Sequence, residues 1–240
     1  MASTHDIPTL DVERRLAEQG YDLIVGFDEV GRGSLAGPVM VGAAAIWAGD
    51  LSSLMVPDGV ADSKLLTERR RERLFEPLQD WCAASAVGQA SNSEIDEWGI
   101  GYALGVAALR ALDGVERQLG LAEVDNAVTD SGIRRVGAIL DGPYDYITKA
   151  LDTFDAPAVP IPAHVVTQVK GDRHCATVAA AAVIAKVTRD HLMVDIARNN
   201  PQYAPYEWEH NKGYGSAAHR RAIATFGPTP LHRISWHLTE

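Results

Sequence analysis

Residues 21–47 read YDLIVGFDEVGRGSLAGPVMVGAAAIW, and this stretch decides the fold class. Residues 21–30 form a short apolar run that ends in charge, and residues 38–47 form a second apolar run. Short buried runs bounded by turn-forming residues are typical of β-strands. Residues 31–37, GRGSLAG, contain too much glycine for a helix. We therefore predict two buried strands joined by a special turn.

The rest of the chain alternates predicted strands with predicted helices. Further strands are expected at residues 83–90, 137–140 and 164–169. Helices are expected after a Thr67 cap, from Ser93 to Leu112, from Ala176 to about Asn199, and from a Ser216 cap to Gly227. The proline-rich stretch 143–163 is expected to be mostly loop. This order predicts an α/β fold with a mixed sheet flanked by helices.

Composition is that of an ordinary globular chain. Among 240 residues, 46% are hydrophobic and 22% are charged, which argues against a disordered or membrane-embedded protein. Even the Ala-rich stretch after Thr177 meets Lys186 before it is long enough to span a bilayer. Cys82 and Cys175 are far apart and form no C-x-x-C pair, so we expect no disulfide framework and no thiolate metal site. A cytoplasmic protein without a membrane anchor is the resulting expectation.

The net charge of −10 at first argues against binding to phosphate backbones. The charge is unevenly distributed, however, because residues 166–240 contain nine Lys and Arg against six Asp and Glu. The acidic excess therefore lies in the first two thirds of the chain. A nucleic-acid ligand is not excluded, and its positive contacts are expected late in the chain.

Four acidic residues stand at positions in apolar segments, where a charged carboxylate is energetically unfavourable. Asp28 and Glu29 end the first predicted strand, and Asp141 ends a later one. Asp190 lies in the middle of the apolar stripe of the predicted helix 176–199. Burying an unpaired carboxylate is unfavourable, so each of these acids needs a partner or a function.

A salt bridge is the simplest partner for any one of them, for example Lys186 at i−4 from Asp190. Four acids from strand ends and a facing helix instead favour an oxygen-only cavity, which suits Mg²⁺ or Mn²⁺ rather than zinc. Two such ions about 3.5–4 Å apart can activate a water and stabilise the leaving oxygen of a phosphodiester. Asp28 and Glu29 are adjacent and would face opposite sides of a regular strand, so the strand must twist or end there for both to serve.

Two glycine-rich motifs could contact a ligand. The spacing around Gly31-Arg32-Gly33 is G-x-G-x-x-x-G with no acid at the ribose offset, so a dinucleotide-binding reading is weak. Bare glycine amides would let a sugar 2′-hydroxyl approach, although the motif taken alone is better explained by a tight strand connection. In Lys212-Gly213-Tyr214-Gly215-Ser216, an aromatic ring precedes a helix N-terminus and could stack on a base or sugar.

Further cations stand in predicted turns, at Ser63-Lys64 and at Lys170. Both positions suit phosphate contacts, and both suit helix caps and surface charge equally well. Taken alone, neither motif indicates a ligand.

The ordered motifs together carry a family resemblance. They are GFDEVGRG (26–33), AGP (36–38), DSK (62–64), EID (94–96), LDG (140–142), KGD (170–172), AAAAVIAKVTRD (179–190), KGYG (212–215) and HRIS (232–235). From about residue 21 to residue 236 the sequence resembles the ribonuclease HII family, the type 2 ribonucleases H of bacteria. The stretch 173–177 (RHCAT) and Ser34 depart from the usual family pattern, and the segment between Asp141 and Lys170 is longer than in many relatives.

This resemblance implies a ribonuclease-H-like mixed sheet, in a single domain over residues 1–240. The catalytic core would cover about 20–200, and a helical extension at about 201–240 would contribute to substrate binding. It also implies a metal-dependent endoribonuclease that cuts the RNA strand of RNA/DNA hybrids and cuts at ribonucleotides embedded in duplex DNA, leaving 3′-hydroxyl and 5′-phosphate ends. We expect this enzyme to act as a monomer.

The resemblance assigns roles to residues at matching positions. The catalytic and metal-binding acids would be Asp28, Glu29, Asp141 and Asp190, with Mg²⁺ or Mn²⁺ as the cofactor. The substrate contacts would be Gly31, Arg32, Gly33, Ser63, Lys64, Lys170 and Tyr214, where the glycine motif contacts the ribonucleotide around its 2′-hydroxyl and Tyr214 packs on the sugar at an RNA to DNA junction. Two alternatives remain, namely another two-metal nuclease of the same fold class and a binding module that cleaves nothing.

Overall fold

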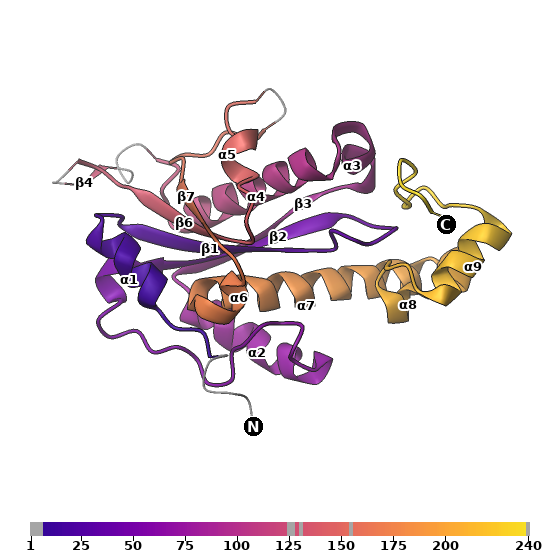
Figure 1. The fold of residues 1–240 in the computed structure, drawn as a ribbon, viewed down its shortest axis with the longest axis horizontal. Helices are drawn as coiled ribbons and strands as arrows, with labels where there is room; N and C mark the ends of the chain where they lie inside the picture. Colours follow the sequence, from indigo (N-terminus) through magenta and orange to yellow (C-terminus); the bar gives the residue numbers. More distant parts are fainter. Residues whose placement is uncertain (1–6, 124–127, 130–131, 154–155, 239–240) are drawn as a thin grey trace.

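A five-stranded mixed sheet forms the centre of the computed structural model, which describes residues 7–123, 128–129, 132–153 and 156–238 (Figure 1). The strand order is β3-β2-β1-β6-β7. These strands are β1 (Leu23–Val30), β2 (Val39–Trp47), β3 (Ala84–Ala90), β6 (Val136–Asp141) and β7 (His164–Gln168). The β1–β2 and β2–β3 pairs are antiparallel, whereas β1–β6 and β6–β7 are parallel. The predicted α/β class with a mixed sheet is confirmed.

Helices cover both faces of this sheet (Figure 1). On one face lies α4 (Ile100–Gln118), and on the other lies α7 (Ala176–Asn199) with α2 (Glu68–Trp81) packed beneath it. The remaining elements are α1 (Asp11–Glu18), η1 (Ala48–Asp50), α3 (Asn92–Trp98), β4 (Val128–Thr129), β5 (Gly132–Ile133), α5 (Ile147–Ala150), α6 (Gly171–His174), η2 (Pro201–Tyr206), α8 (Trp208–Asn211) and α9 (Ala217–Phe226).

Small residues let α7 lie very close to the sheet. A Cβ on Gly26 of β1 would stand 2.3 Å from the backbone of Thr177, and one on Gly42 of β2 would stand 2.4 Å from the carbonyl oxygen of Ala181. The run of alanines on α7 is therefore a packing feature, because larger side chains would push the helix away from the strands. This close packing fixes Asp190, two helical turns further on, relative to the acids of β1.

The helix predicted from Ser93 to Leu112 is wrong at both ends. Ser91 is the N-cap, since its hydroxyl accepts the Glu94 N–H and the Glu94 carboxylate accepts the Ser91 N–H in return. This first helix, α3, ends at Gly99, whose φ of 79° interrupts the chain before α4 begins. The helices predicted after Thr67, over 176–199 and after Ser216 are confirmed as α2, α7 and α9.

The predicted helical C-terminal region contains η2, α8 and α9, which lie beyond one end of the sheet (Figure 1). Its buried centre is Trp208, packed with Tyr206 and with Met193 of α7. Cys82 and Cys175 are both buried and free. Among the described residues, no helix has the length and hydropathy needed to cross a membrane.

Candidate active site

Three of the four predicted acids gather where β1 extends past its parallel neighbour. The β1–β6 ladder ends at the Phe27–Leu140 pair, so Asp28 and Glu29 extend beyond it while Asp141 ends β6 beside them. On its other side β1 stays paired with β2 as far as Val30. The strand therefore does not end at Asp28, and the two adjacent acids are presented at an edge rather than buried within a continuous sheet.

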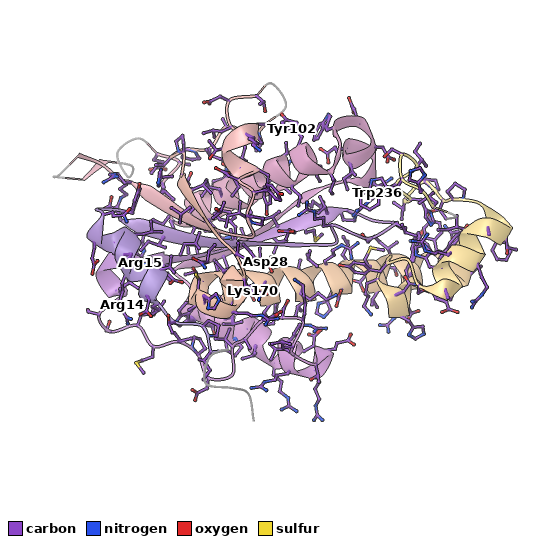
Figure 2. The ribbon with its side chains drawn as sticks, in the orientation of Figure 1. Arg14, Arg15, Asp28, Tyr102, Lys170 and Trp236 are labelled. Carbon is purple, nitrogen blue, oxygen red and sulfur yellow. The ribbon has the colours of Figure 1, made fainter. Side chains whose placement is uncertain are left out.

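Negative charge is concentrated at this edge, and Figure 2 marks the position of Asp28. Asp28 is only 4% exposed, and its burial raises its pKa well above the usual value, with the Glu29 and Asp141 carboxylates adding to the effect. Its Oδ1 atom accepts the N–H of Glu29 at 2.8 Å. Glu29 is held at both oxygens, because Oε1 lies 3.2 Å from the Arg32 guanidinium and Oε2 accepts the Tyr146 hydroxyl at 3.3 Å.

Asp190 is paired with cations. Its Oδ1 atom lies 2.7 Å from Nζ of Lys186, and its Oδ2 atom lies 3.9 Å from the Arg71 guanidinium. The salt bridge considered for this acid is therefore present in the structure. Lys186 also lies over the ring of Tyr214, with Nζ 5.7 Å from the ring centroid.

In this arrangement the acids do not form a ready-made metal cage. No group of three or more His, Cys, Asp or Glu that could hold a metal ion is found in the part of the chain that the structure describes. The donor chemistry nevertheless fits a hard divalent cation, since burial raises the pKa of Asp28 and repulsion from the Glu29 and Asp141 carboxylates raises it further. A cation would relieve this repulsion, and Asp190 could join only by releasing Lys186.

Lys64 supplies positive charge next to the acids. Burial alone would lower its pKa, but the carboxylates of Asp28, Asp172 and Asp62 outweigh burial and raise it. Asp62 shapes this turn, because its Oδ1 atom accepts the Lys64 N–H at 2.8 Å and its Oδ2 atom lies 3.1 Å from the Arg173 guanidinium.

Asp172 lies in the same cluster. Burial raises its pKa to about 6, and the carboxylates of Asp62 and Asp141 contribute to the increase. Lys170 is exposed, with a left-handed φ of 57°. The contact with the acids in this segment comes instead from the next residue, whose amide, Gly171 N–H, donates to Asp141 Oδ1 at 2.7 Å.

Two buried arginines hold the glycine-rich loop. The Arg189 guanidinium donates to Ser34 Oγ at 2.7 Å and to the carbonyl oxygen of Pro38 at 3.0 Å. Arg233 donates to the carbonyl oxygens of Gly31 at 2.7 Å and Arg32 at 2.8 Å. The Gly31 carbonyl oxygen also accepts the Ser34 N–H and the Ser34 hydroxyl, so several hydrogen bonds converge on the start of this loop. The loop is therefore a rigid part of the site.

Gly31 and Gly33 differ in whether the structure requires glycine at that position. Gly31 has a φ of +79°, and a Cβ there would stand 2.1 Å from Nε of Arg189, so glycine is structurally necessary. Gly33 has no heavy atom within 4 Å of an added Cβ and is exposed. The structural interpretation of the motif thus applies to Gly31, whereas Gly33 is open to a ligand.

The ring of Tyr214 lies against the loop through a hydrogen bond from the Gly31 N–H to its hydroxyl at 3.1 Å. A closed histidine network fixes its backbone. Nδ1 of His219 lies 2.9 Å from the Tyr214 carbonyl oxygen, and Nε2 of His219 lies 3.0 Å from both Nε1 of Trp208 and Nε2 of His232. Since the carbonyl and the indole fix the donors, His219 is protonated on Nδ1 and His232 on Nε2.

The acids of β1, the start of the glycine-rich loop and Tyr214 line a cavity of about 370 Å³, which we call the Tyr214 pocket. Eight of the eleven predicted site residues line it, namely Asp28, Glu29, Gly31, Arg32, Gly33, Ser63, Lys64 and Tyr214. Asp141, Lys170 and Asp190 do not line it. Asp190 is nevertheless connected to it through Lys186, which does.

Several residues at the site were not predicted from the sequence. Tyr146, Asp172, Arg189 and Arg233 all contact predicted site residues or the loop that carries them. Asp172 belongs to the KGD motif, so its position beside Lys170 was an available signal. Arg189 and Arg233 belong to the motifs 179–190 and 232–235, but these motifs do not show what the arginines bind, because the partners lie far away along the chain. Tyr146 has no local signal.

The family model of ribonuclease HII matches residues 25–239. The chain belongs to the ribonuclease HII family. Ribonuclease HII of Streptomyces griseus is 40% identical over 233 residues, which cover 97% of this chain and 85% of that protein. Ribonuclease HII proteins are hydrolytic endoribonucleases, and this chain is one of them.

Solved structures share the ribonuclease HII fold described above. The crystal structure of the ribonuclease H2 from Pyrococcus horikoshii has a TM-score of 0.64 at 25% identity, and the match covers 90% of this chain and 95% of that one. The crystal structure of Bst-RNase HIII in complex with Mn²⁺ has a TM-score of 0.61 at 20% identity, covering 93% and 70% respectively. The ribonuclease-H-like architecture expected from the sequence is confirmed.

Proposed function

We propose that this ribonuclease HII cuts the RNA strand of RNA/DNA hybrids and cuts beside single ribonucleotides embedded in duplex DNA. The products would carry 5′-phosphate and 3′-hydroxyl ends. The observation that carries this proposal is the Tyr214 pocket, where an aromatic ring and an exposed glycine loop lie directly against the buried acids. A sugar 2′-hydroxyl is both a donor and an acceptor, so a rigid backbone loop can recognise it.

Asp28, Glu29, Asp141 and Asp190 would hold two Mg²⁺ or Mn²⁺ ions. The all-oxygen donor set supports this assignment, as does the repulsion among the carboxylates, which adds to burial in raising the pKa of Asp28. When bound, such ions lower the pKa of a coordinated water and stabilise charge on the leaving oxygen. Lys186 would then move from Asp190 to the substrate phosphate, which is a short step because it already lines the pocket.

The protein residues around the acids would position the substrate. Arg233 and Arg189 hold the loop so that Arg32 and Gly33 face the ribonucleotide, and Tyr214 would pack on its sugar. Ser63 and Lys64 would contact phosphate at the pocket wall, and Lys170 would do so from the exposed turn beside it.

Residues 1–240 would act as a single domain, in which the extension at about 201–240 contributes Tyr214 to substrate binding. The packing of Trp208 of α8 against Met193 of α7 supports one continuous unit. We also infer a monomeric, cytoplasmic enzyme. The two free, buried cysteines support a reducing compartment.

The decisive experiment uses a labelled DNA duplex that carries one ribonucleotide, incubated with Mg²⁺, Mn²⁺ or a chelator, with the cut position determined on a gel. We expect cleavage beside the ribonucleotide only when metal is present. Asp141→Asn and Asp190→Asn should fold normally and lose nearly all activity. Asp195→Asn is the matched control, since Asp195 is an exposed acid on the same helix as Asp190.

Other outcomes would contradict specific parts of the proposal. Near-full activity of Asp141→Asn and Asp190→Asn would refute the assignment of the acids. Cleavage that does not depend on the ribonucleotide would indicate a generic two-metal nuclease. Binding without any cleavage, in any metal, would indicate a binding module.

A further inference from the structure

A second cavity opens beside the acids, where α5 and the turn before it approach the start of α4. This cavity, here the α4–α5 pocket, has a volume of about 600 Å³. Glu29 and Arg32 line both this pocket and the Tyr214 pocket, whereas Asp141 lines only this one of the two. Glu29 and Arg32, which form an ion pair, therefore separate the two pockets. Asp28 and Glu29 line the Tyr214 pocket, and Glu29 and Asp141 line the α4–α5 pocket.

The α4–α5 pocket has a well-defined framework. A Cβ on Gly105 would stand 2.4 Å from the Tyr146 carbonyl oxygen and 2.5 Å from Cβ of Ala150, so α5 packs directly on α4. Asp145 begins α5 by accepting the N–H of Thr148 at 2.9 Å. These contacts hold α5 and the backbone of Tyr146 in place, and Figure 2 shows Tyr102 on this side of the molecule.

The polar groups of the inner wall already have partners, but two side chains at the rim do not. The hydroxyl of Tyr102 pairs with Thr153, and that of Tyr146 pairs with Glu29. The ring of Tyr144 is 69% exposed, and Lys149 is exposed as well. Within the described ranges, neither Tyr144 nor Lys149 has a hydrogen bond, ion pair or ring contact. An aromatic ring beside a free ammonium group complements a nucleotide, because a base or sugar packs on the ring and a phosphate pairs with the cation.

The hydrolysis of a phosphodiester bond indicates where such a nucleotide would bind relative to the acids. Water adds to the phosphorus of one phosphodiester, the bond to one ester oxygen breaks, and that oxygen takes up a proton as it leaves. The cut strand must therefore cross the acids, with one flank on each side of them. We propose that the α4–α5 pocket receives the cut strand on the side opposite the sugar packed on Tyr214, and that its rim binds the second nucleotide from the cut bond, with Tyr144 against the base or sugar and Lys149 on the phosphate. This inference rests on the proposed function.

The test uses duplexes with one ribonucleotide in which the cut strand is shortened towards the cut, one nucleotide at a time, from either end. For the wild-type protein, kcat/KM should fall about tenfold when the second nucleotide from the cut on the α4–α5 side is removed, because the cut bond itself stays intact. Tyr144→Ala and Lys149→Gln should already show this loss on the full-length duplex, and should lose nothing more on the shortened one. The matched controls, Tyr144→Phe and Lys149→Arg, should behave like the wild type.

Two results would overturn this inference and leave the proposed function intact. One is that both variants cut the full-length duplex as fast as the wild type, and the other is that they lose the same factor on every substrate. A wild-type protein that cuts none of these duplexes would overturn the proposed function together with the inference. Both side chains are exposed, so unchanged thermal unfolding is expected and shows that the variants are folded.

Discussion

Acidification is expected to weaken the C-terminal region through His232. This imidazole is 1% exposed, and burial, helped by the neighbouring His219, lowers its pKa from 6.5 to about 4. The unfolded chain therefore takes up a proton below about pH 6.5, while the folded protein resists until about pH 4. The stabilisation is complete above pH 6.5 and is lost as the pH falls. By pH 4.5 the loss amounts to about 2–3 kcal/mol of unfolding free energy.

The cost has a structural cause, because both ring nitrogens of His232 are already hydrogen-bonded. Its Nδ1 atom accepts the Thr229 N–H at 2.8 Å, and its Nε2–H donates to His219. A proton on Nδ1 would place two donors face to face. In His232→Asn, the side-chain oxygen can still accept the Thr229 N–H but does not titrate.

The assay is urea unfolding followed by tryptophan fluorescence at several pH values between 8 and 4.5. Buried acids titrate in both proteins, so their effects cancel in the difference between wild type and His232→Asn. This difference should shrink by about 2–3 kcal/mol from pH 8 to pH 4.5. His210→Asn, which removes an exposed imidazole from the same region, is the matched control. A difference that stays constant over this range would refute the reasoning.

Three further predictions follow from single contacts. Gly31→Ala should lower the free energy of unfolding by about 1–3 kcal/mol in denaturant titrations, whereas Gly33→Ala should leave it unchanged, because only the first position has a positive φ and a blocked Cβ. Burial raises the pKa of Glu116 to about 7, so its stabilising effect is present below pH 4.5 and lost as the pH rises through 7. Glu116→Gln should therefore gain stability relative to the wild type between pH 5 and pH 8, and a constant difference would contradict this. Tyr146→Phe removes the hydroxyl that holds Glu29, and kcat should fall about tenfold without a change in thermal stability; unchanged kcat would show that this contact is not needed.

The sequence predicts the sheet and most of the acid cluster because both depend on local patterns. Asp28 and Asp141 are recognisable since each follows an apolar run, and a strand end is where a carboxylate can reach a ligand. The Ser91 capping box appears in the sequence as S-x-x-E, but the acids that follow Ser93 favour a helix start two residues too late. A four-residue helix such as α5 has too few turns to show periodicity, so the α4–α5 pocket could not be predicted.

Other features depend on contacts between distant segments. The pairing of Asp190 with Arg71 and the carbonyl contacts of Arg189 and Arg233 join parts of the chain that share no local pattern. A buried arginine that binds backbone oxygens has no partner that can be recognised by residue type. Tertiary packing alone reveals such a role.

The hydrogen bonds of Arg189 and Arg233 to the loop 31–38 also have a consequence for the order in which the site forms during protein synthesis. The loop is made early, yet Gly31 is 202 positions away from Arg233, which holds its carbonyl oxygen. A nascent or truncated chain that stops before Arg233 already contains all four acids and Arg189, and it lacks only the contacts of Arg233. Under the proposed function, ribonucleotide selectivity should therefore be the last property that the growing chain acquires, and incomplete translation products should discriminate poorly between ribonucleotides and deoxyribonucleotides.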